Sequence, residues 1–403
     1  MVCMKPAAKI MILFLLLQLA FVALMLSAFV LPEKRIEKNA DKFLYALNRE
    51  GDYPKSVFKD ASGVLDNFTE KMMLNNAKAT TGNVLKDSMI PGYSRYWHGY
   101  VAFLRPMLLV FNYDIRHLYV AVFFPLLFFA LILIRDKINA FAALSLLVST
   151  ILTSITSVSS SMQFAHVYLV MFASIIVLLA KNRLFLANHT AFLMAFLTIG
   201  AVTNFVDFLT APLITLGVPL ALFYVVAIRN RQEPHAPVLR YIILPSAVWG
   251  IGYAGTWISK WALSTLILRK NVFANALQQG TLRVGGSEEF PLRRLEMLTT
   301  NLYQTWATKP AVLLLAVFTI VLLYFAVKSG CRKSKIVQNL PLVLVAFYPL
   351  AWYNVFANHS QIHHWFTFRM MMVAFFPLFL LLSNLIGQKK ICKTRSEHQI
   401  PHS

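Results

Sequence analysis

The chain has 403 residues, of which 58% are hydrophobic and only 14% are charged, whereas soluble domains average about half apolar and a quarter charged. This composition excludes a water-soluble or disordered protein, and the three cysteines are too few for a disulfide-stapled secreted domain. The formal net charge of +21 would indicate nucleic acid or an anionic surface in a soluble chain. Here the basic residues must first be assigned to the two sides of a membrane.

Ten apolar runs are long enough to cross a bilayer, since about 20 residues span about 30 Å of hydrocarbon. We therefore predict an all-α, polytopic membrane protein with about ten transmembrane helices in one integral membrane domain over residues 1–403. The first run is too long for a signal-peptide core and lacks a small-x-small cleavage site, which predicts an uncleaved anchor. The expected helices cover residues 10–31, 117–134, 138–158, 164–180, 184–205, 209–228, 241–263, 310–327, 336–356 and 367–386.

Lys and Arg lie in every second connection, and basic short loops face the cytoplasm. The connections at 159–163, 204–208 and 358–366 contain neither residue. We therefore expect both termini to be cytoplasmic in a multi-pass plasma-membrane protein, with outer segments at 32–116 and 264–309. Much of the positive charge then signals orientation and contact with anionic membrane lipids, so no nucleic-acid partner is expected. The basic residues of these connections are Arg135, Lys137, Lys181, Arg183, Arg229, Arg231, Arg240, Lys328, Arg332, Lys333, Lys335, Lys389, Lys390, Lys393 and Arg395.

The three cysteines, Cys3, Cys331 and Cys392, fall on the expected cytoplasmic side. Thiols stay reduced in that compartment, and none of the three has a metal-ligand or CxxC spacing. We expect unpaired structural thiols.

The first outer segment is predicted to be helical. Residues 33–47 form an amphipathic pattern suited to the membrane surface, and residues 62–74 give a second helical stretch. A turn at Pro91-Gly92 precedes the aromatic stretch 93–100. Residues 101–111 are apolar but interrupted by Arg105-Pro106, which predicts an interfacial or re-entrant helix.

Three acidic residues are catalytic candidates. Asp66 and Glu70 are four residues apart, so a helix would place both on one face, where a carboxylate can act as a general base; the alternative is an ordinary solvated face. Asp207 is the only acid inside an apolar run, and acids within spans are functional candidates. Asp207 can equally cap the helix expected from residue 209, or do both.

Basic, aromatic and histidine residues supply candidate binding groups. Lys260 lies between Trp257 and Trp261, which suits either a snorkelling side chain or a phosphate clamp. His166 lies at the outer start of the fourth expected helix. His359 and His363, spaced for one helix face, precede Arg369; this group suits sugar or phosphate recognition with Arg369 as the anion partner, or simple interfacial hydrogen bonding. No third metal ligand is marked by spacing, so no metal site is predicted.

The sequence contains no GxxxxGK[ST], no GxGxxG before a helix, no GxSxG and no HExxH motif. No expected cytoplasmic loop is long enough for a nucleotide-binding domain. A nucleotide-driven pump and a nucleotide-sugar enzyme are disfavoured, and any activated substrate is expected to enter from the lipid phase.

In its layout the chain resembles, over residues 10–386, the GT-C superfamily of polytopic glycosyltransferases. The following segments are similar to those of bacterial multi-pass proteins: Leu65-Asp66-Asn67-Phe68-Thr69-Glu70, Tyr96-Trp97-His98-Gly99-Tyr100, Val206-Asp207-Phe208-Leu209 and Thr256-Trp257-Ile258-Ser259-Lys260-Trp261. The superfamily has a cytoplasmic N-terminus and a long, helical first outer loop.

The resemblance implies a polyprenyl-phosphate-linked sugar as donor and inverting transfer to an extracytoplasmic glycan or lipid acceptor, such as a cell-envelope glycan, a glycolipid or a teichoic-acid-type polymer. It implies an acid of the first loop as base, with Asp66 the better match and Glu70 second. Lys260, Arg369 and Arg95 would hold the lipid phosphate, and Trp97 and His98 would contact the sugar. The family's acid usually lies nearer the first helix, in a DxD or ExD pair, whereas Asp66 is followed by Asn67. No cofactor is expected, and a divalent metal is possible but not indicated.

Two other classes stay open. A membrane acyltransferase would use a histidine within the membrane, but no early span holds a His beside an acid. A transporter or flippase for a lipid-linked or polar substrate would use paired charges near the midplane, where the sequence offers only Asp207 and Lys260, both near the outer edge.

Overall fold

The computed structural model describes residues 5–55, 63–90, 92–230, 238–286, 288, 291–330 and 333–386. The three cysteines and the basic residues Arg231, Arg332, Lys389, Lys390, Lys393 and Arg395 lie outside these ranges. The expectations for them are therefore not addressed by the structure.

The described residues form helices that are joined by turns and loops, and the one β-type contact among them is an isolated bridge between Lys55 and Val64. Two short helices of other geometry, a π-helix at Leu239–Ile243 and a 3-10 helix at Phe368–Met371, lead into α13 and α22. The α-helices are α1 Pro6–Phe29, α2 Glu33–Glu50, α3 Asn67–Lys78, α4 Val84–Asp87, α5 Val101–Leu108, α6 Ile115–Lys137, α7 Ala140–Leu152, α8 Ile155–Ser160, α9 Met162–Ala180, α10 Asn182–Ala187, α11 His189–Val206, α12 Ile214–Asn230, α13 Leu244–Leu268, α14 Val272–Gly285, α15 Arg294–Gln304, α16 Lys309–Lys328, α17 Lys333–Asn339, α18 Pro341–Ala346, α19 Tyr348–Val355, α20 Ala357–Ile362, α21 His364–Thr367 and α22 Met372–Leu385.

Within the described residues, seven helical segments are long and apolar enough to cross a membrane. The chain is thus a helical, membrane-embedded protein, but the expected count of about ten spans is not confirmed. Each remaining expected run has a helix: α7 has 13 residues, α12 has 17, and α13 contains Lys260 with several glycines and serines. The seven are Pro6–Phe29, Ile115–Lys137, Met162–Ala180, His189–Val206, Lys309–Lys328, Lys333–Val355 and His364–Leu385.

Several of the expected runs are broken into shorter helices, and the run 336–356 is divided among α17, α18 and α19. The run 138–158 divides between α7 and α8 at Ser154, whose φ of 65° is left-handed and ends a right-handed helix. The run 184–205 divides between α10 and α11, where the Asn188 side chain accepts a hydrogen bond from the Ala191 amide and caps α11. Apolar composition alone does not reveal such breaks.

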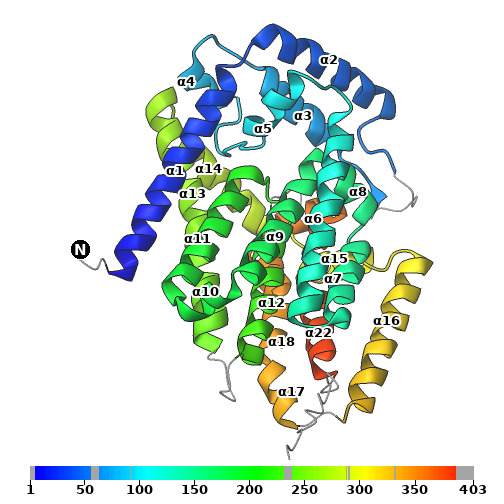
Figure 1. Ribbon diagram of the computed structural model, residues 1–403. Helices are drawn as coiled ribbons and strands as arrows, with labels where there is room; N and C mark the ends of the chain where they lie inside the picture. The colour runs from blue at the N-terminus through cyan, green and yellow to red at the C-terminus, as the bar shows by residue number, and fades with distance from the viewer. Residues whose placement is uncertain are drawn as a thin grey trace, which may run out of the picture.

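Helices α2 to α5 gather at one end of the helical bundle, opposite α17 (Figure 1). We call this the α2–α5 end. The predicted amphipathic helix of the first segment is present as α2, which buries Ile36, Ala40, Phe43 and Leu47. The second predicted stretch is α3, and the apolar stretch with Arg105-Pro106 forms the short α5. These helices form a layer over the bundle.

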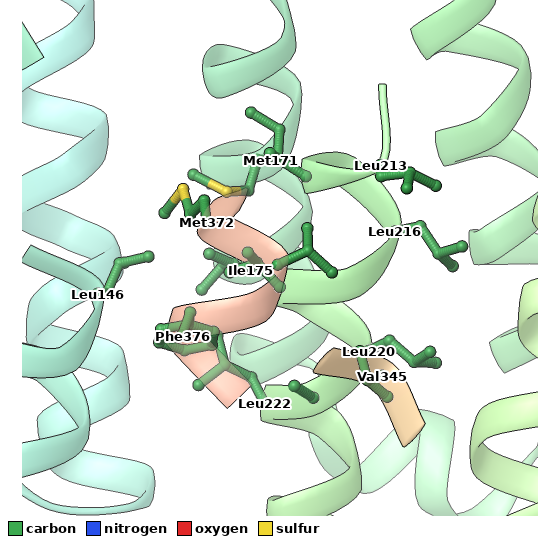
Figure 2. Packing of buried hydrophobic residues seen from close by; sticks show 14 of the residues in the cluster. Leu146, Met171, Ile175, Leu213, Leu216, Leu220, Leu222, Val345, Met372 and Phe376 are labelled. Atoms are coloured by element: carbon green, nitrogen blue, oxygen red, sulfur yellow. The ribbon is translucent and has the colours of Figure 1, made fainter. Parts of the chain in front are cut away.

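The core of the bundle is built around α12, which is buried along nearly its whole length. Its buried residues belong to one hydrophobic cluster with Met171 and Ile175 of α9 and with Met372 and Phe376 of α22 (Figure 2). In contrast, only 17% of the residues in the most apolar stretch of α1, and likewise of α16, are buried. Their exposed faces are suited to lipid contact.

Helices α11 and α13 pack at backbone distance through Gly200 and Gly252. A Cβ on Gly200 would lie 2.1 Å from the Trp249 carbonyl oxygen, and one on Gly252 would lie 2.3 Å from the Leu197 carbonyl oxygen. Small residues permit such close approach between membrane helices. This contact fixes the position of Asp207, which follows α11.

Candidate functional site

Several polar side chains singled out by sequence are buried together at the α2–α5 end. They come from α3, from the aromatic stretch after α4, from the start of α9, from the α11–α12 connection and from α20 to the start of α22. Burying polar groups is costly unless they find partners, so the partners of each group distinguish structural residues from candidate functional ones.

Glu70 is a structural residue in this arrangement. Its Oε2 accepts hydrogen bonds from Arg116 Nε at 3.1 Å and Nη2 at 2.6 Å. Its Oε1 accepts from the Ser161 hydroxyl and the Met162 amide, both at 2.8 Å. The carboxylate is thereby fully occupied and fastens α3 to α6 and to the start of α9. It has no free position to act as a base.

Asp66 has a different environment from Glu70, although both are buried. It is the N-cap of α3 and accepts hydrogen bonds from the Thr69 amide and hydroxyl, each at 2.9 Å. The Trp365 indole lies beside it. Burial raises the pKa of Asp66 above its ordinary value, against the lowering effect of the Thr69 hydrogen bonds. Asp66 is thus a cap whose carboxyl also borders Trp365.

Arg369 is buried near Asp66 with half of its guanidinium unpaired. Nη1 donates to the Trp365 carbonyl at 3.1 Å, and the guanidinium lies 4.0 Å from the centroid of the Phe164 ring. Nε and Nη2 have no hydrogen-bond partner. These two atoms form one edge of the guanidinium, the edge that can bind a carboxylate or phosphate in a bidentate manner. Arg369 is therefore a credible oxyanion contact.

His359 and His363 lie between Trp365 and the α11–α12 connection. Their rings are 4.8 Å apart, and the His363 ring is 5.1 Å from that of Trp365. His359 Nε2 lies 3.0 Å from the Leu209 carbonyl oxygen. Because a carbonyl only accepts, Nε2 holds the proton and Nδ1 is an acceptor, which has no partner. Burial lowers the pKa of both histidines, that of His363 to about 4.

Asp207 lies at the turn between α11 and α12. Its carboxyl accepts hydrogen bonds from the amide and hydroxyl of Thr210 and so stabilises the turn 207–210. The predicted role as N-cap of a helix from residue 209 is wrong, because α12 begins only at Ile214. Leu209 within this turn has a φ of 67°. Burial raises the pKa of Asp207 to about 6, with the hydrogen bonds opposing the shift. A carboxyl with this pKa can exchange a proton near neutral pH.

Three residues that the sequence did not single out, Asn204, Tyr253 and Arg283, lie in the neighbourhood of Asp207. Tyr253 of α13 lies close enough to Asp207, Arg283 and Tyr96 for electrostatic interaction, and the Asn204 amide is next to its hydroxyl. The Arg283 guanidinium donates to the Tyr96 hydroxyl. We call Asn204, Asp207, Tyr253 and Arg283, with the adjoining His359, the Asp207 cluster. These residues come from four separated segments, so no local spacing marks them.

His98 takes part in a chain of hydrogen bonds on the other side of the turn. Its Nε2 donates to the Tyr93 carbonyl at 2.7 Å, which leaves Nδ1 to accept from the Tyr100 hydroxyl at 3.3 Å. Burial lowers the pKa of His98 to about 3. The His98 and Tyr100 rings lie 5.2 Å and 5.0 Å from that of Phe208. His98 is thus a neutral, oriented residue adjoining the turn that holds Asp207.

His166 marks the end of an apolar groove of about 430 Å³ between α5, α6, α9 and α11. Its Nε2 hydrogen-bonds with the Tyr119 hydroxyl at 2.9 Å, and its ring lies 6.3 Å from that of Tyr100. Two of the lining residues, Phe103 and Val122, are half exposed. The full lining is Phe103, Met107, Leu118, Tyr119, Val122, Leu126, His166, Leu169, Val170, Ala173, Val202 and Val206.

One end of this groove adjoins the α11–α12 connection. Val206, which lines the groove, directly precedes Asp207, although no residue of the Asp207 cluster lines the groove itself. Phe208 follows Asp207 and contacts Tyr100. A long apolar ligand in the groove would therefore place a polar end group near the connection that contains Asp207.

A second hollow, of about 340 Å³, lies between α15 and the α20–α21 segment and has a polar lining. Gln361 closes one side, since it accepts a hydrogen bond from the Arg293 amide at 2.7 Å and donates to the Pro291 carbonyl at 3.0 Å. His364, the neighbour of Trp365, lines the same hollow. Its lining consists of Pro291, Arg293, Glu296, Met297, Thr300, Gln361 and His364.

The structure does not bring Trp97 and Lys260 into this site. The Trp97 indole is fully buried and donates to the Thr256 carbonyl at 2.7 Å. Lys260 Nζ donates to the Met89 carbonyl at 3.0 Å and lies 5.2 Å from the Trp97 ring. In this arrangement both residues hold α13 against the first segment, and neither is presented to a lipid headgroup.

Arg95 also lies to one side of the Asp207 cluster. Its guanidinium stacks on Tyr93 at 4.2 Å and donates to the Asn275 side chain at 3.3 Å. It therefore links the aromatic stretch to α14.

No group of three or more His, Cys, Asp or Glu side chains that could hold a metal ion occurs in the part of the chain that the structure describes. Comparison of the chain with models of protein families, with curated proteins and with solved structures gives no significant match.

Proposed function

We propose that this protein is a membrane glycosyltransferase of GT-C-like architecture, which transfers a sugar from a polyprenyl-phosphate donor to an acceptor outside the cytoplasm. The proposal is supported chiefly by the apolar groove whose lining includes Val206, the residue that directly precedes Asp207. An apolar groove with a few convergent polar groups at one end suits an amphiphilic ligand. A polyprenyl chain would occupy the groove, and the linked sugar would meet the Asp207 cluster.

The proposed orientation follows from the alternation of basic connections, with cytoplasmic termini, about ten spans and the α2–α5 end facing out. Residues 32–116 and 264–309 then supply the outer part of the site. The polar hollow lined by Gln361 and His364 offers the acceptor an approach separate from the lipid groove.

Asp207 is our first choice for the group that accepts the proton of the acceptor hydroxyl. It directly follows Val206, which lines the groove, and its raised pKa makes it a better proton acceptor than an ordinary carboxylate. Asp66 is the second choice, since Trp365 and Arg369 adjoin it. The free edge of Arg369 would bind an oxyanion of one substrate. Glu70, which the resemblance placed second, is assigned no catalytic role.

The direct test is transfer of radiolabelled sugar from polyprenyl phosphate in proteoliposomes containing the full chain. We expect a covalent product with the wild type and a loss of at least about 100-fold with Asp207→Asn, the size of a general-base contribution. Asp66→Asn tests the second choice in the same assay. Full activity in both variants refutes the base assignment. Vectorial accumulation of an unmodified substrate would instead indicate a transporter.

A further inference from the structure

The Asp207 cluster contains buried polar groups whose hydrogen-bonding capacity is unmet. The Asn204 amide, the Tyr253 hydroxyl and His359 Nδ1 make no hydrogen bond of ordinary geometry, although the Asn204 amide and the Tyr253 hydroxyl lie close enough to interact with each other. All three side chains are at least nine-tenths buried. Even if Asn204 and Tyr253 satisfy one another in part, the other Asn204 amide atom and His359 Nδ1 have no partner. Leaving buried polar groups unsatisfied is costly, so these groups indicate a further partner.

These groups are uncharged, and they include both hydrogen-bond donors and hydrogen-bond acceptors. The Asn204 amide and the Tyr253 hydroxyl can each donate and accept, and His359 Nδ1 is an acceptor because Nε2 donates to Leu209. The Asn358 side chain donates to the Leu282 carbonyl at 2.8 Å and leaves its oxygen without a partner. A partner that both donates and accepts several hydrogen bonds would satisfy them, which is the property of a ring of hydroxyl groups.

Aromatic side chains border the same groups. The Trp257 ring lies 5.4 Å from Tyr253 and 6.0 Å from Tyr96, and the Phe208 ring lies 5.9 Å from Tyr96. Apolar faces beside a few oriented polar groups are the usual composition of small-molecule sites. Such rings can cover the C–H faces of a sugar while the polar groups bind its edge.

We propose that Asn204, Tyr253 and His359 form the subsite that binds the hydroxyl groups of a pyranose ring. Asn204 and Tyr253 bind hydroxyls as both donors and acceptors, and His359 Nδ1 accepts from one. Arg283, held by Tyr96, borders the subsite on the side of α14. The choice of a sugar as the ligand rests on the proposed function. The subsite adds to that function the residues that select the sugar.

The test compares two lipids on the full chain in nanodiscs: a polyprenyl phosphate that carries a hexose, and the same polyprenyl phosphate without a sugar. Tyr253→Phe removes only the hydroxyl, and Asn204→Leu removes the amide at similar volume. We expect each variant to weaken binding of the hexose-bearing lipid by about five- to tenfold, the size of one lost hydrogen bond. Binding of the sugar-free lipid should be unchanged.

The matched control is Tyr224→Phe, since the Tyr224 hydroxyl donates to the Gln338 carbonyl beside α17, at the opposite end of the bundle. It should bind both lipids as the wild type does. Equal losses on the two lipids in Tyr253→Phe and Asn204→Leu, or a wild type that binds both lipids equally well, would overturn the subsite.

A second measurement separates failure of the subsite from failure of the proposed function. If the wild type binds neither lipid, the proposed donor is wrong, and saturation-transfer NMR with a panel of methyl glycosides then tests the subsite alone. Signals that appear with the wild type and Tyr224→Phe but vanish with Tyr253→Phe support a sugar site. No signal from any glycoside with the wild type overturns it.

Discussion

Replacing Glu70 by Gln should strongly destabilise the protein, because the buried ion pair with Arg116 joins three helices. Glu70 is fully buried and accepts four hydrogen bonds at 2.6–3.1 Å. Glutamine keeps the shape but removes the charge, and its NH₂ group must face either the guanidinium or the donors at the start of α9. Removing one member of a buried pair typically costs about 3–5 kcal/mol. Glu50 still contacts Arg116 at 3.0 Å, so we expect the lower part of that range.

Thermal unfolding of the detergent-solubilised full chain measures this effect. The control is Asp52→Asn, which breaks the Lys71–Asp52 pair, whose side chains are 21% and 49% exposed. An exposed pair contributes about 0–1 kcal/mol, so its Tm should change little. The double variant Glu70→Leu with Arg116→Met should lose less stability than Glu70→Gln, because it leaves no unpaired buried charge. If Glu70→Gln keeps the Tm of the control but loses transfer activity, Glu70 is a functional residue and our interpretation is wrong.

Three further predictions concern packing, protonation and the backbone. Gly252→Val should prevent the α11–α13 contact and abolish the elution peak of the folded protein in size-exclusion chromatography. Gly250→Ala, where a Cβ meets nothing within 4 Å, should elute normally, and normal elution of both variants would contradict the close contact. The pKa of Asp207 is raised from 3.8 to about 6, so as the pH falls through this window the folded state takes up a proton before the unfolded chain. Thermal stability should therefore rise from pH 6 to pH 4 while transfer activity falls, and Asp207→Asn should remove the stability change; an activity loss centred near pH 4 would refute the shift. Ser154→Gly should raise the unfolding free energy by up to about 1 kcal/mol, because Ser154 has a φ of 65° that glycine adopts without strain; a clear decrease in Tm would refute this.

Much of the fold was predictable because apolar length and amphipathic period are local properties of the chain. The ten apolar runs each contain a helix, and α2 has the buried face that its pattern predicts. The breaks at Ser154 and at residues 187–189 were not predictable, since they depend on a left-handed residue and a side-chain cap inside apolar sequence.

The candidate site was predictable only in part. Asp207, Lys260 and Arg369 were selected as charged residues in or beside apolar runs, Asp66 and Glu70 by their spacing, and the histidines as hydrogen-bonding side chains. The structure buries all of these candidates except His363. The partners of Glu70 and Lys260, which are Arg116 and the Met89 carbonyl, lie 46 and 171 residues away in sequence. The sequence therefore could not separate structural residues from free ones.

Asn204, Tyr253 and Arg283 were missed for a related reason. An asparagine at the end of an apolar helix, a tyrosine within α13 and an arginine on an amphipathic helix are individually unremarkable positions. They become a candidate site only because the glycine contact brings α11 and α13 together and α14 folds back toward Tyr96. Only tertiary structure provides that information.

The central claim is that the groove between α6, α9 and α11 delivers a lipid-linked sugar to Asp207. Photo-crosslinking tests it most directly, with a polyprenyl-phosphate sugar that carries a photoreactive group in the chain, followed by mass-spectrometric mapping on the full protein in nanodiscs. We expect labelling of the groove residues Leu169 and Val170, and competition by unlabelled donor. Labelling of the lipid-facing Ile320 on α16 should be weaker and not competed. Equal, uncompeted labelling of the groove and of α16 would contradict the account.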